Sequence, residues 1–217
     1  MVCKSNRVGS IPTSTSDINK KGYMSNLQFN PNLTPRQVIQ LGAFGGCYFG
    51  LPIEEYTNYE YTELFNYHFK GLDTSLYLGE TYKPRMNKFK IRSGMDYDYW
   101  KTMGWMNERD PYGWFEWWMK YNMGIRGEDD DRQVRRWQDF AGSKGRWRNR
   151  IYRRIYETGN WDVSPRIQQS LLHWGYKVNE EDYYQWKALN DLDTAITDKK
   201  MWDHYSELPN PSWYESK

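Results

Sequence analysis

Two carboxylates lie close together among large aromatic rings, and this combination could perform acid–base chemistry. Asp110 and Glu116 stand six residues apart in the segment DPYGWFEWW. A carboxyl group that is surrounded by rings loses hydration, so its pKa is expected to rise, as in a general acid. The alternative is structural: Glu116 would be a buried carboxylate paired with an arginine from positions 132–154. Of the two, the structural pairing is the favoured interpretation.

The histidines are the other candidates for acid–base chemistry. His173 is expected at the C-terminal end of a helix, where the helix dipole favours a cation. It is interpreted as a helix cap, with a catalytic base as the alternative. No His or Cys pair has the spacing of a metal site, so we expect no metal and no cofactor. Cys47 follows two glycines without a nucleophile motif around it and is interpreted as a buried structural thiol.

A dense run of positive charge is the strongest functional signal in the chain. Between positions 132 and 154, nine basic residues are interrupted by one acid, Asp139. The nine are Arg132, Arg135, Arg136, Lys144, Arg146, Arg148, Arg150, Arg153 and Arg154. The planar guanidinium fork suits phosphate contacts, and Trp137 and Trp147 between the arginines could stack on bases. The sequence therefore predicts an arginine-rich helix pair that binds a polyanion, with nucleic acid as the leading candidate.

Three alternatives to nucleic-acid binding stay open. The acidic segments 128–131 and 180–182 could neutralise the arginines within the fold, and Trp137 and Trp147 fall on apolar stripes that are typical of a core. A second alternative is an enzyme that acts on a small anionic or nucleotide-like substrate, with a carboxylate as the acid–base group. The third is a structural or assembly protein that packs on a partner protein through an aromatic surface.

The composition predicts a folded chain with a core made of rings. Only 38% of the 217 residues are apolar, whereas aromatic residues make up 18%, with 12 Trp and 19 Tyr. The net charge of +2 argues against a disordered, self-repelling chain, so we expect rings to replace the scarce aliphatic residues. The chain has no apolar run of about 18 residues and no apolar segment after its start, which predicts a soluble intracellular protein without a membrane helix.

Helix caps and apolar periodicity predict a single, mainly α-helical domain over residues 34–195. Helices are expected over 36–41, 132–140, 144–156, 166–174 and 179–189, and residues 113–123 are expected to form a buried helix or a buried hinge element. Residues 64–69 are expected to form a short helix or strand, and residues 95–105 a short helix or an ordered loop. Short strands are an alternative across residues 51–92. Four glycines within residues 42–50 predict a tight structural turn, because no phosphate-loop pattern is present.

Both ends of the chain are expected to lie outside this domain. Residues 1–33 are polar and rich in Ser, Thr, Asn and Pro, which predicts a disordered extension, and residues 196–217 are expected to form a tail. The residues GSIP at positions 9–12 also match one reading frame of GGTTCGATTCC, which is typical of a tRNA T-arm. One hypothesis is therefore that residues 1–23 are a gene-calling overrun and that translation starts at Met24. An ordinary disordered tail is the alternative.

Several motifs together resemble a family of uncharacterised proteins found in bacteria, viruses and some eukaryotic microbes. The motifs are LGAFGGCY from position 41, DPYGWFEW from 110, DDDRQVRRW from 129, GRWR from 145 and QSLLHWGY from 169. The resemblance would span about residues 38–186 and implies one domain with extensions at both ends. It implies no activity and no site residues, since none is established for the family. Residues 51–92 are longer here than the corresponding part of the family.

Overall fold

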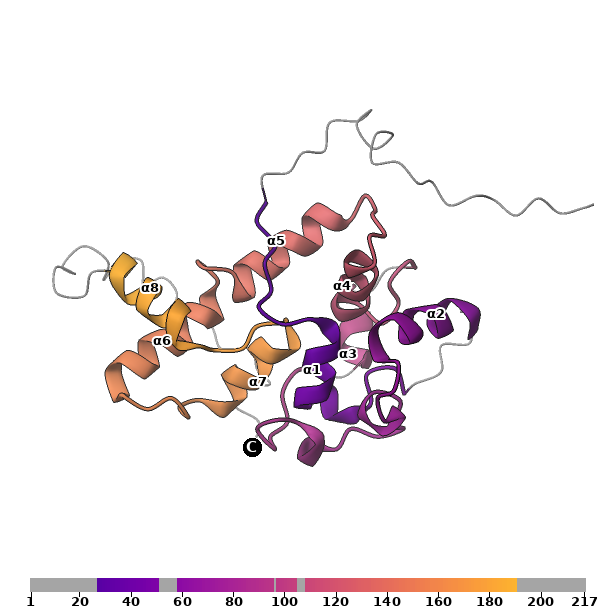
Figure 1. Cartoon of the computed structure of the whole chain (residues 1–217), viewed down its shortest axis with the longest axis horizontal. Helices are drawn as coiled ribbons and strands as arrows, with labels where there is room; N and C mark the ends of the chain where they lie inside the picture. The colour runs from indigo at the N-terminus through magenta and orange to yellow at the C-terminus, as the bar shows by residue number, and fades with distance from the viewer. Residues whose placement is uncertain (1–26, 51–57, 96, 105–107, 191–217) are drawn as a thin grey trace, which may run out of the picture.

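The computed structural model describes residues 27–50, 58–95, 97–104 and 108–190, and within these ranges it contains helices and turns but no strand (Figure 1). The α-helices are α1 (Pro35–Leu41), α2 (Asn58–Phe69), α3 (Tyr97–Thr102), α4 (Trp114–Asn122), α5 (Asp130–Ala141), α6 (Arg146–Thr158), α7 (Pro165–His173) and α8 (Glu180–Asn190). Short 3-10 turns are η2 (Phe44–Gly46), η3 (Thr74–Leu76) and η4 (Pro84–Met86). The mainly α-helical prediction is confirmed. None of the described helices is both long and apolar enough to cross a membrane.

The region in which short strands were an alternative is helical where the structure describes it. Residues 58–92 contain α2, η3 and η4, joined by turns. Their Tyr, Asn and Gly residues give weak periodicity because much of this region consists of single turns rather than long helices. The predicted overrun and the predicted tail both lie outside the described residues.

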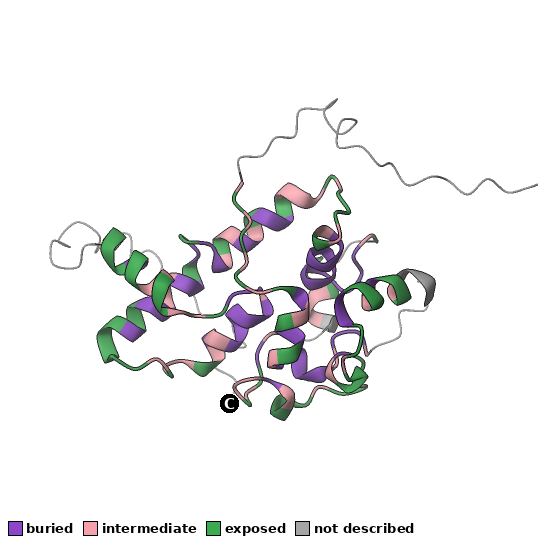
Figure 2. Cartoon of the chain, viewed as in Figure 1, coloured by how far each residue is buried: buried purple, intermediate pink, exposed green. Residues whose placement is uncertain are grey.

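The helices form two groups with three helices between them. Figure 1 shows α2, α3 and α4 toward one end of the molecule, α6 and α8 toward the other, and α1, α5 and α7 between the two groups. The α4 helix packs against α1, α2 and α5, whereas α6 packs against α5, α7 and α8. Figure 2 shows α4 as mostly buried and α8 as largely exposed. The segment that carries Glu116 is therefore buried, and α6, which carries most of the arginines in residues 132–154, lies toward one end of the molecule.

Rings supply most of the core, as the composition predicted. The buried apolar residues form one cluster, in which Trp117 and Trp137 are among the largest fully buried side chains. Phe29, from the segment before α1, places its ring between α4, which carries Trp117, and α5, which carries Trp137. Its ring centroid lies 5.5 Å from that of Trp117 and 5.3 Å from that of Trp137. Edge and tilted contacts of this kind are the favoured geometry of aromatic pairs.

The packed part of the chain begins earlier than the sequence predicted. Residues 27–33 belong by composition to the disordered extension, yet they lie extended along the helices. The backbone N–H of Leu33 donates to the carbonyl of Gly175 over 3.1 Å. The Asn32 side chain accepts a hydrogen bond from the backbone N–H of Lys177 and donates one to its carbonyl, both over 2.8 Å. Composition missed this segment because a few anchoring side chains are diluted by polar neighbours.

The glycine-rich segment 42–50 is a tight turn, as predicted, because backbone packs directly on backbone there. Gly42 has a φ of +96°, and a Cβ at this position would lie 2.3 Å from the carbonyl oxygen of Met86. A Cβ on Gly50 would lie 1.8 Å from the carbonyl oxygen of Gly79. Neither approach leaves room for a side chain, so both positions require glycine by contact, and Gly42 requires it by conformation as well.

Replacing Gly42 by alanine is expected to lower the free energy of unfolding by about 3 kcal/mol or more, because a strained φ and a backbone clash add together. Urea denaturation measures the loss. Gly71→Ala is the matched control, since Gly71 also has a positive φ of +78° but no atom within 4 Å of the added Cβ. Equal losses in the two variants would show that the close approach to Met86 is not a constraint.

Candidate functional site

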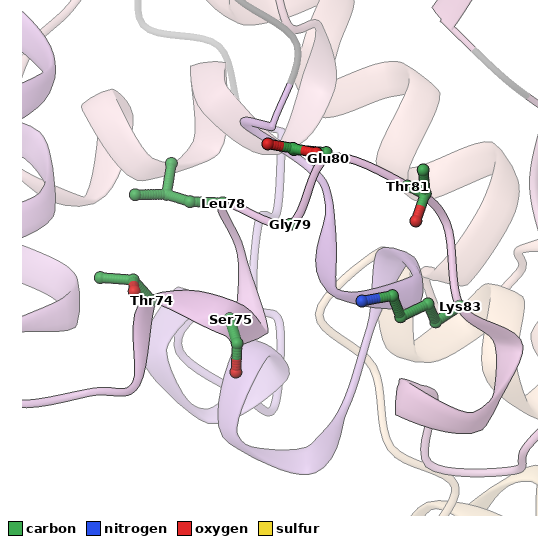
Figure 3. A pocket seen from close by; sticks show the side chains of 7 residues that line it. All are labelled: Thr74, Ser75, Leu78, Gly79, Glu80, Thr81 and Lys83. Atoms are coloured by element: carbon green, nitrogen blue, oxygen red, sulfur yellow. The ribbon is translucent and has the colours of Figure 1, made fainter.

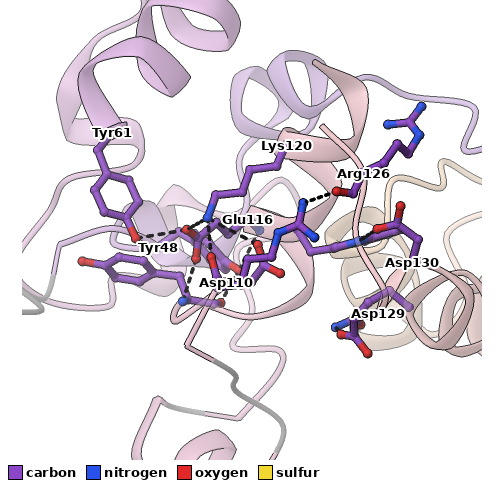
Figure 4. A network of polar contacts seen from close by, with 12 residues as sticks. Tyr48, Tyr61, Asp110, Glu116, Lys120, Arg126, Asp129 and Asp130 are labelled. Carbon is purple, nitrogen blue, oxygen red and sulfur yellow. Dashed lines mark hydrogen bonds and ion pairs between the residues drawn. The ribbon is translucent and has the colours of Figure 1, made fainter. Parts of the chain in front are cut away.

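The two candidate carboxylates, Asp110 and Glu116, meet at one buried lysine (Figure 4). The Lys120 ammonium lies 2.9 Å from Glu116 Oε1 and 3.4 Å from Asp110 Oδ1. Their exposed fractions are 1% for Asp110, 0% for Glu116 and 5% for Lys120. The predicted pairing of Glu116 with an arginine is wrong, because Lys120 stands one turn further along the same helix. We call Asp110, Glu116 and Lys120 the buried ionic cluster.

Further polar groups complete the environment of Glu116, and sequence reasoning missed them. The Tyr61 hydroxyl of α2 donates to Glu116 Oε1 over 3.0 Å, and the backbone N–H of Tyr112 donates to Oε2 over 2.8 Å. The hydroxyl of Tyr48 accepts from the backbone N–H of Glu116 and donates to the carbonyl of Tyr112. The spacing of four residues between Glu116 and Lys120 was the one local signal of this cluster. The tyrosines come from distant segments that only the fold brings together.

The buried ionic cluster can hold a proton near neutral pH. Burial raises the pKa of Glu116 to about 7, against the lowering effect of Lys120 and the Tyr112 N–H. Burial also raises the pKa of Asp110, again with Lys120 opposing it. Lys120 opposes the effect of burial at both carboxylates, and Arg109 adds to this opposition at Asp110; a proton on Glu116 lowers the negative charge held inside the fold. Because Glu116 is fully buried, a substrate could reach it only if the surrounding rings moved.

His173 belongs to a different set of hydrogen bonds from the carboxylates. Its Nε2 accepts from the backbone N–H of Phe44 over 3.1 Å and lies 3.1 Å from the side-chain nitrogen of Gln169. Its ring stacks on that of Phe44 at 4.3 Å between centroids. Burial lowers the pKa of His173 to about 3, so the imidazole is neutral and not the cationic helix cap that we predicted. The side chain turns into the fold and supports the glycine turn.

Cys47 and the remaining metal-ligating residue types add no second site among the described residues. The Cys47 thiol is half-buried and donates to the carbonyl of Phe44 over 3.3 Å. Burial raises its pKa, which disfavours the reactive thiolate. Within the described ranges, no three His, Cys, Asp or Glu side chains are grouped so that they could hold a metal ion.

The arginines of α5 are balanced by acids. This helix carries three arginines and three aspartates. Arg132 also forms a two-bond pair with Asp129, with 2.7 Å between Nη2 and Oδ2. Arg136 donates to Gln133 over 2.9 Å, and its guanidinium lies 5.6 Å from the ring centroid of Trp174. The positive charge of residues 132–154 looked stronger in the sequence because the count began at position 132 and left out the acids at positions 128–131.

Arg148 is structural and cannot contact a ligand as predicted. Its side chain is buried, and its Nη2 lies 2.9 Å from Asp182 Oδ1 on α8. The Tyr176 hydroxyl and the Asn179 side chain donate to the other Asp182 oxygen over 2.7 and 2.8 Å. The guanidinium also lies 4.5 Å from the ring centroid of Tyr176. The acidic segment at the start of α8 thus neutralises one arginine, which the structural alternative predicted.

Six basic residues remain. Arg135 is exposed on α5, and the other five lie in the turn before α6 or on α6, where Arg150 is half-buried and the rest are exposed. We call this set the α6 basic face: Lys144, Arg146, Arg150, Arg153 and Arg154. Arg146, Arg150 and Arg154 follow each other at intervals of four residues, or about 6 Å along the helix axis. Arg153 is paired with Glu157 over 3.0 Å. The structure therefore brings together about half of the predicted basic residues and separates them from Arg132 and Arg148.

A surface hollow of about 330 Å³ lies away from the α6 basic face and the buried ionic cluster (Figure 3). It is lined by Thr74, Ser75, Leu78, Gly79, Glu80, Thr81 and Lys83. No residue predicted from the sequence to act in a site lines it.

The chain's own geometry is the basis for a functional assignment. The sequence resemblance to an uncharacterised family stays a prediction. Comparisons with protein-family models, with curated proteins and with solved structures found no match.

Proposed function

We propose that the protein binds nucleic acid through the α6 basic face. The observation that carries this proposal is the row of Arg146, Arg150 and Arg154 at successive turns of α6, with Lys144 in the turn before it. Glu157 is the one acid of α6, and it lies beside Arg153. Positive charge is therefore concentrated on the outer side of one helix, although the whole chain carries a net charge of only +2. Such local concentration attracts an extended polyanion.

Binding would be driven mainly by the release of counterions from phosphates. Guanidinium groups form paired hydrogen bonds with phosphate oxygens, and spacing at successive helical turns lets neighbouring arginines contact neighbouring phosphates. If three to four of these side chains contact phosphates, we expect log K to fall with log salt at a slope of about −3 to −4. Nine contacts, as the sequence suggested, would give a slope of about −8.

The triple variant Arg146→Gln, Arg150→Gln and Arg154→Gln is expected to bind oligonucleotides at least about tenfold more weakly at low salt, with a salt slope closer to zero by about 2.7. Fluorescence anisotropy with a labelled oligonucleotide measures both quantities. The matched control removes three exposed lysines from the other group of helices: Lys70→Gln, Lys83→Gln and Lys101→Gln.

The comparison between the two triple variants decides the proposal. Both lower the net charge by the same amount, so a merely global electrostatic effect would weaken binding equally. Equal losses, or no detectable binding by the wild-type protein at low salt, would overturn the proposal. Circular dichroism of each variant confirms that the helices are intact.

Acid–base catalysis is a second candidate, and it has one supporting observation. The pKa of Glu116 lies near 7, which is the range of an efficient general acid or base at neutral pH. The full burial of this side chain favours a role in the core instead. Nucleic-acid binding is the stronger proposal because four of the five residues of the α6 basic face are exposed.

A further inference from the structure

We infer that the ligand of the α6 basic face is the phosphodiester backbone of a double-stranded nucleic acid, held without readout of its bases. This inference rests on the proposed function and names its substrate class. It follows from what surrounds the arginines: the tryptophan between them is covered, the nearby amides are engaged, and a second helix widens the surface.

Trp147 is not available to stack on an unpaired base. Its exposed fraction is 6%, and the guanidinium groups of Arg146 and Arg150 lie 5.5 and 5.6 Å from its ring centroid. Proteins that bind single strands usually present free ring faces to successive bases. The ring within the α6 basic face is instead covered by the arginines that would bind phosphate.

The next rings along the surface are also engaged with protein. Phe140 and Trp174 stack on each other with 4.8 Å between centroids and 18° between planes. Trp174 contacts Trp114 as well, at 4.5 Å. These contacts use the broad faces of the rings that a base would need. Single-strand stacking is therefore disfavoured along the whole junction of α5 and α6.

The side-chain amides near the α6 basic face are engaged in the fold. Asn149 donates from Nδ2 to the carbonyl of Gly145 over 2.8 Å, and its Oδ1 accepts from the indole N–H of Trp186 over 2.8 Å. The Gln138 amide nitrogen donates to the carbonyl of Gln28 over 2.9 Å. Asn and Gln read adenine with both of these groups at once, so neither residue is free to do so.

The width of the surface also argues against reading bases from within a groove. α8 lies alongside α6, as shown by the Asn149–Trp186 hydrogen bond and by Lys187, whose ammonium lies 5.7 Å from the ring centroid of Tyr156. Two adjacent helices are about 20 Å across, whereas the major groove of B-DNA is about 12 Å wide. The arginines would therefore meet the phosphates at the edge of the groove. A duplex offers a higher density of phosphates than a single strand, about one per 1.7 Å of helix axis.

The experiment is a set of anisotropy titrations of the full chain with five labelled probes of equal length. The probes are an A/T-rich DNA duplex, a G/C-rich DNA duplex, an RNA duplex and one single strand of each sugar type. We expect the two DNA duplexes to bind within about threefold of each other, and both single strands at least about fivefold more weakly than the duplexes. The RNA duplex shows whether the backbone is held regardless of its sugar.

The outcomes separate this inference from the proposed function. A preference of more than about tenfold between the DNA duplexes, or tighter binding of a single strand, would overturn the inference but leave nucleic-acid binding intact. No binding of any probe would overturn both. The variant Tyr156→Leu, Tyr184→Leu removes exposed rings of α6 and α8, whose exposed fractions are 40% and 61%. Duplex and single-strand binding should both be unchanged in it, and a selective loss of single-strand binding would also overturn the inference.

Discussion

Replacing Lys120 by methionine is expected to lower the free energy of unfolding by about 3–5 kcal/mol, the cost of removing one partner from a buried ion pair. Methionine keeps the length of the side chain but leaves Glu116 and Asp110 without their common cation. Urea denaturation followed by tryptophan fluorescence measures the change. The loss should be smaller at pH 5 than at pH 8, because Glu116 can take up a proton at the lower pH.

Two further variants test whether this loss comes from charge. Lys101→Met removes an exposed lysine from α3 and is expected to cost less than about 0.5 kcal/mol. The double variant Glu116→Gln, Lys120→Met should recover part of the stability, since one uncompensated carboxylate is gone. If Lys120→Met cost no more than Lys101→Met, the buried ionic cluster would not stabilise the fold.

Fold stability is also expected to depend on pH through two buried groups that act in opposite directions. His173 has its pKa lowered from 6.5 to about 3, so only the unfolded chain takes up a proton between these values. The contribution of neutral His173 to the free energy of unfolding is complete above pH 6.5 and is lost as the pH falls toward 3. Glu116 has its pKa raised from 4.5 to about 7, so the native state holds the extra proton. The contribution of protonated Glu116 to the free energy of unfolding is complete below pH 4.5 and is lost as the pH rises through 7.

These opposing effects can be separated by measuring the free energy of unfolding between pH 3 and 8 in single variants. The pKa shifts correspond to about 5 kcal/mol for His173 and about 3 kcal/mol for Glu116. His173→Gln should remove most of the loss on the acidic side, because its amide oxygen can accept from Phe44 without titrating. Glu116→Gln should remove the loss between pH 5 and 7. Glu63→Gln, which replaces an exposed carboxylate of α2, is the control. If the free energy of unfolding of His173→Gln and Glu116→Gln depended on pH in the same way as that of the control, this account would be wrong.

The helices were predictable because their signals are local. At the start of α1, Thr34 accepts from the backbone N–H of Gln37, and Gln37 accepts from that of Thr34, with Pro35 in the first turn. The stripe of apolar residues in α6 includes Trp147 and Ile151, both buried. A cap and a period of about 3.6 residues can each be read within a dozen residues. These signals placed six of the eight described α-helices within two residues of their observed bounds, whereas α2 begins at Asn58, six residues before the short helix or strand expected there.

The partners of the charged residues could not be predicted in the same way. The burial of Glu116 followed from its aromatic neighbours, but its hydrogen bond to Tyr61 spans 55 residues. Arg148 looked equivalent to Arg150 in the sequence, although Arg148 is buried and paired with Asp182, whereas Arg150 is half-buried and lies over the ring of Trp147. Two residues along a helix rotate a side chain by about half a turn, so adjacent arginines of one run separate into core and surface.

The crowded indoles in the core have an optical consequence. The ring centroids of Trp114 and Trp118 are 5.4 Å apart, and those of Trp114 and Trp117 are 5.9 Å apart, all within one helix. Chromophores at such separations couple their electronic transitions, so the folded chain should show strong near-ultraviolet circular dichroism. Burial of the indoles should also shift the tryptophan emission to the blue. Unfolding should remove both the dichroism and the blue shift. Phe29 adds no indole, but it closes this cluster from the N-terminal side. Loosening of the segment around Phe29 should therefore be visible as a change in emission colour, before any helix is lost.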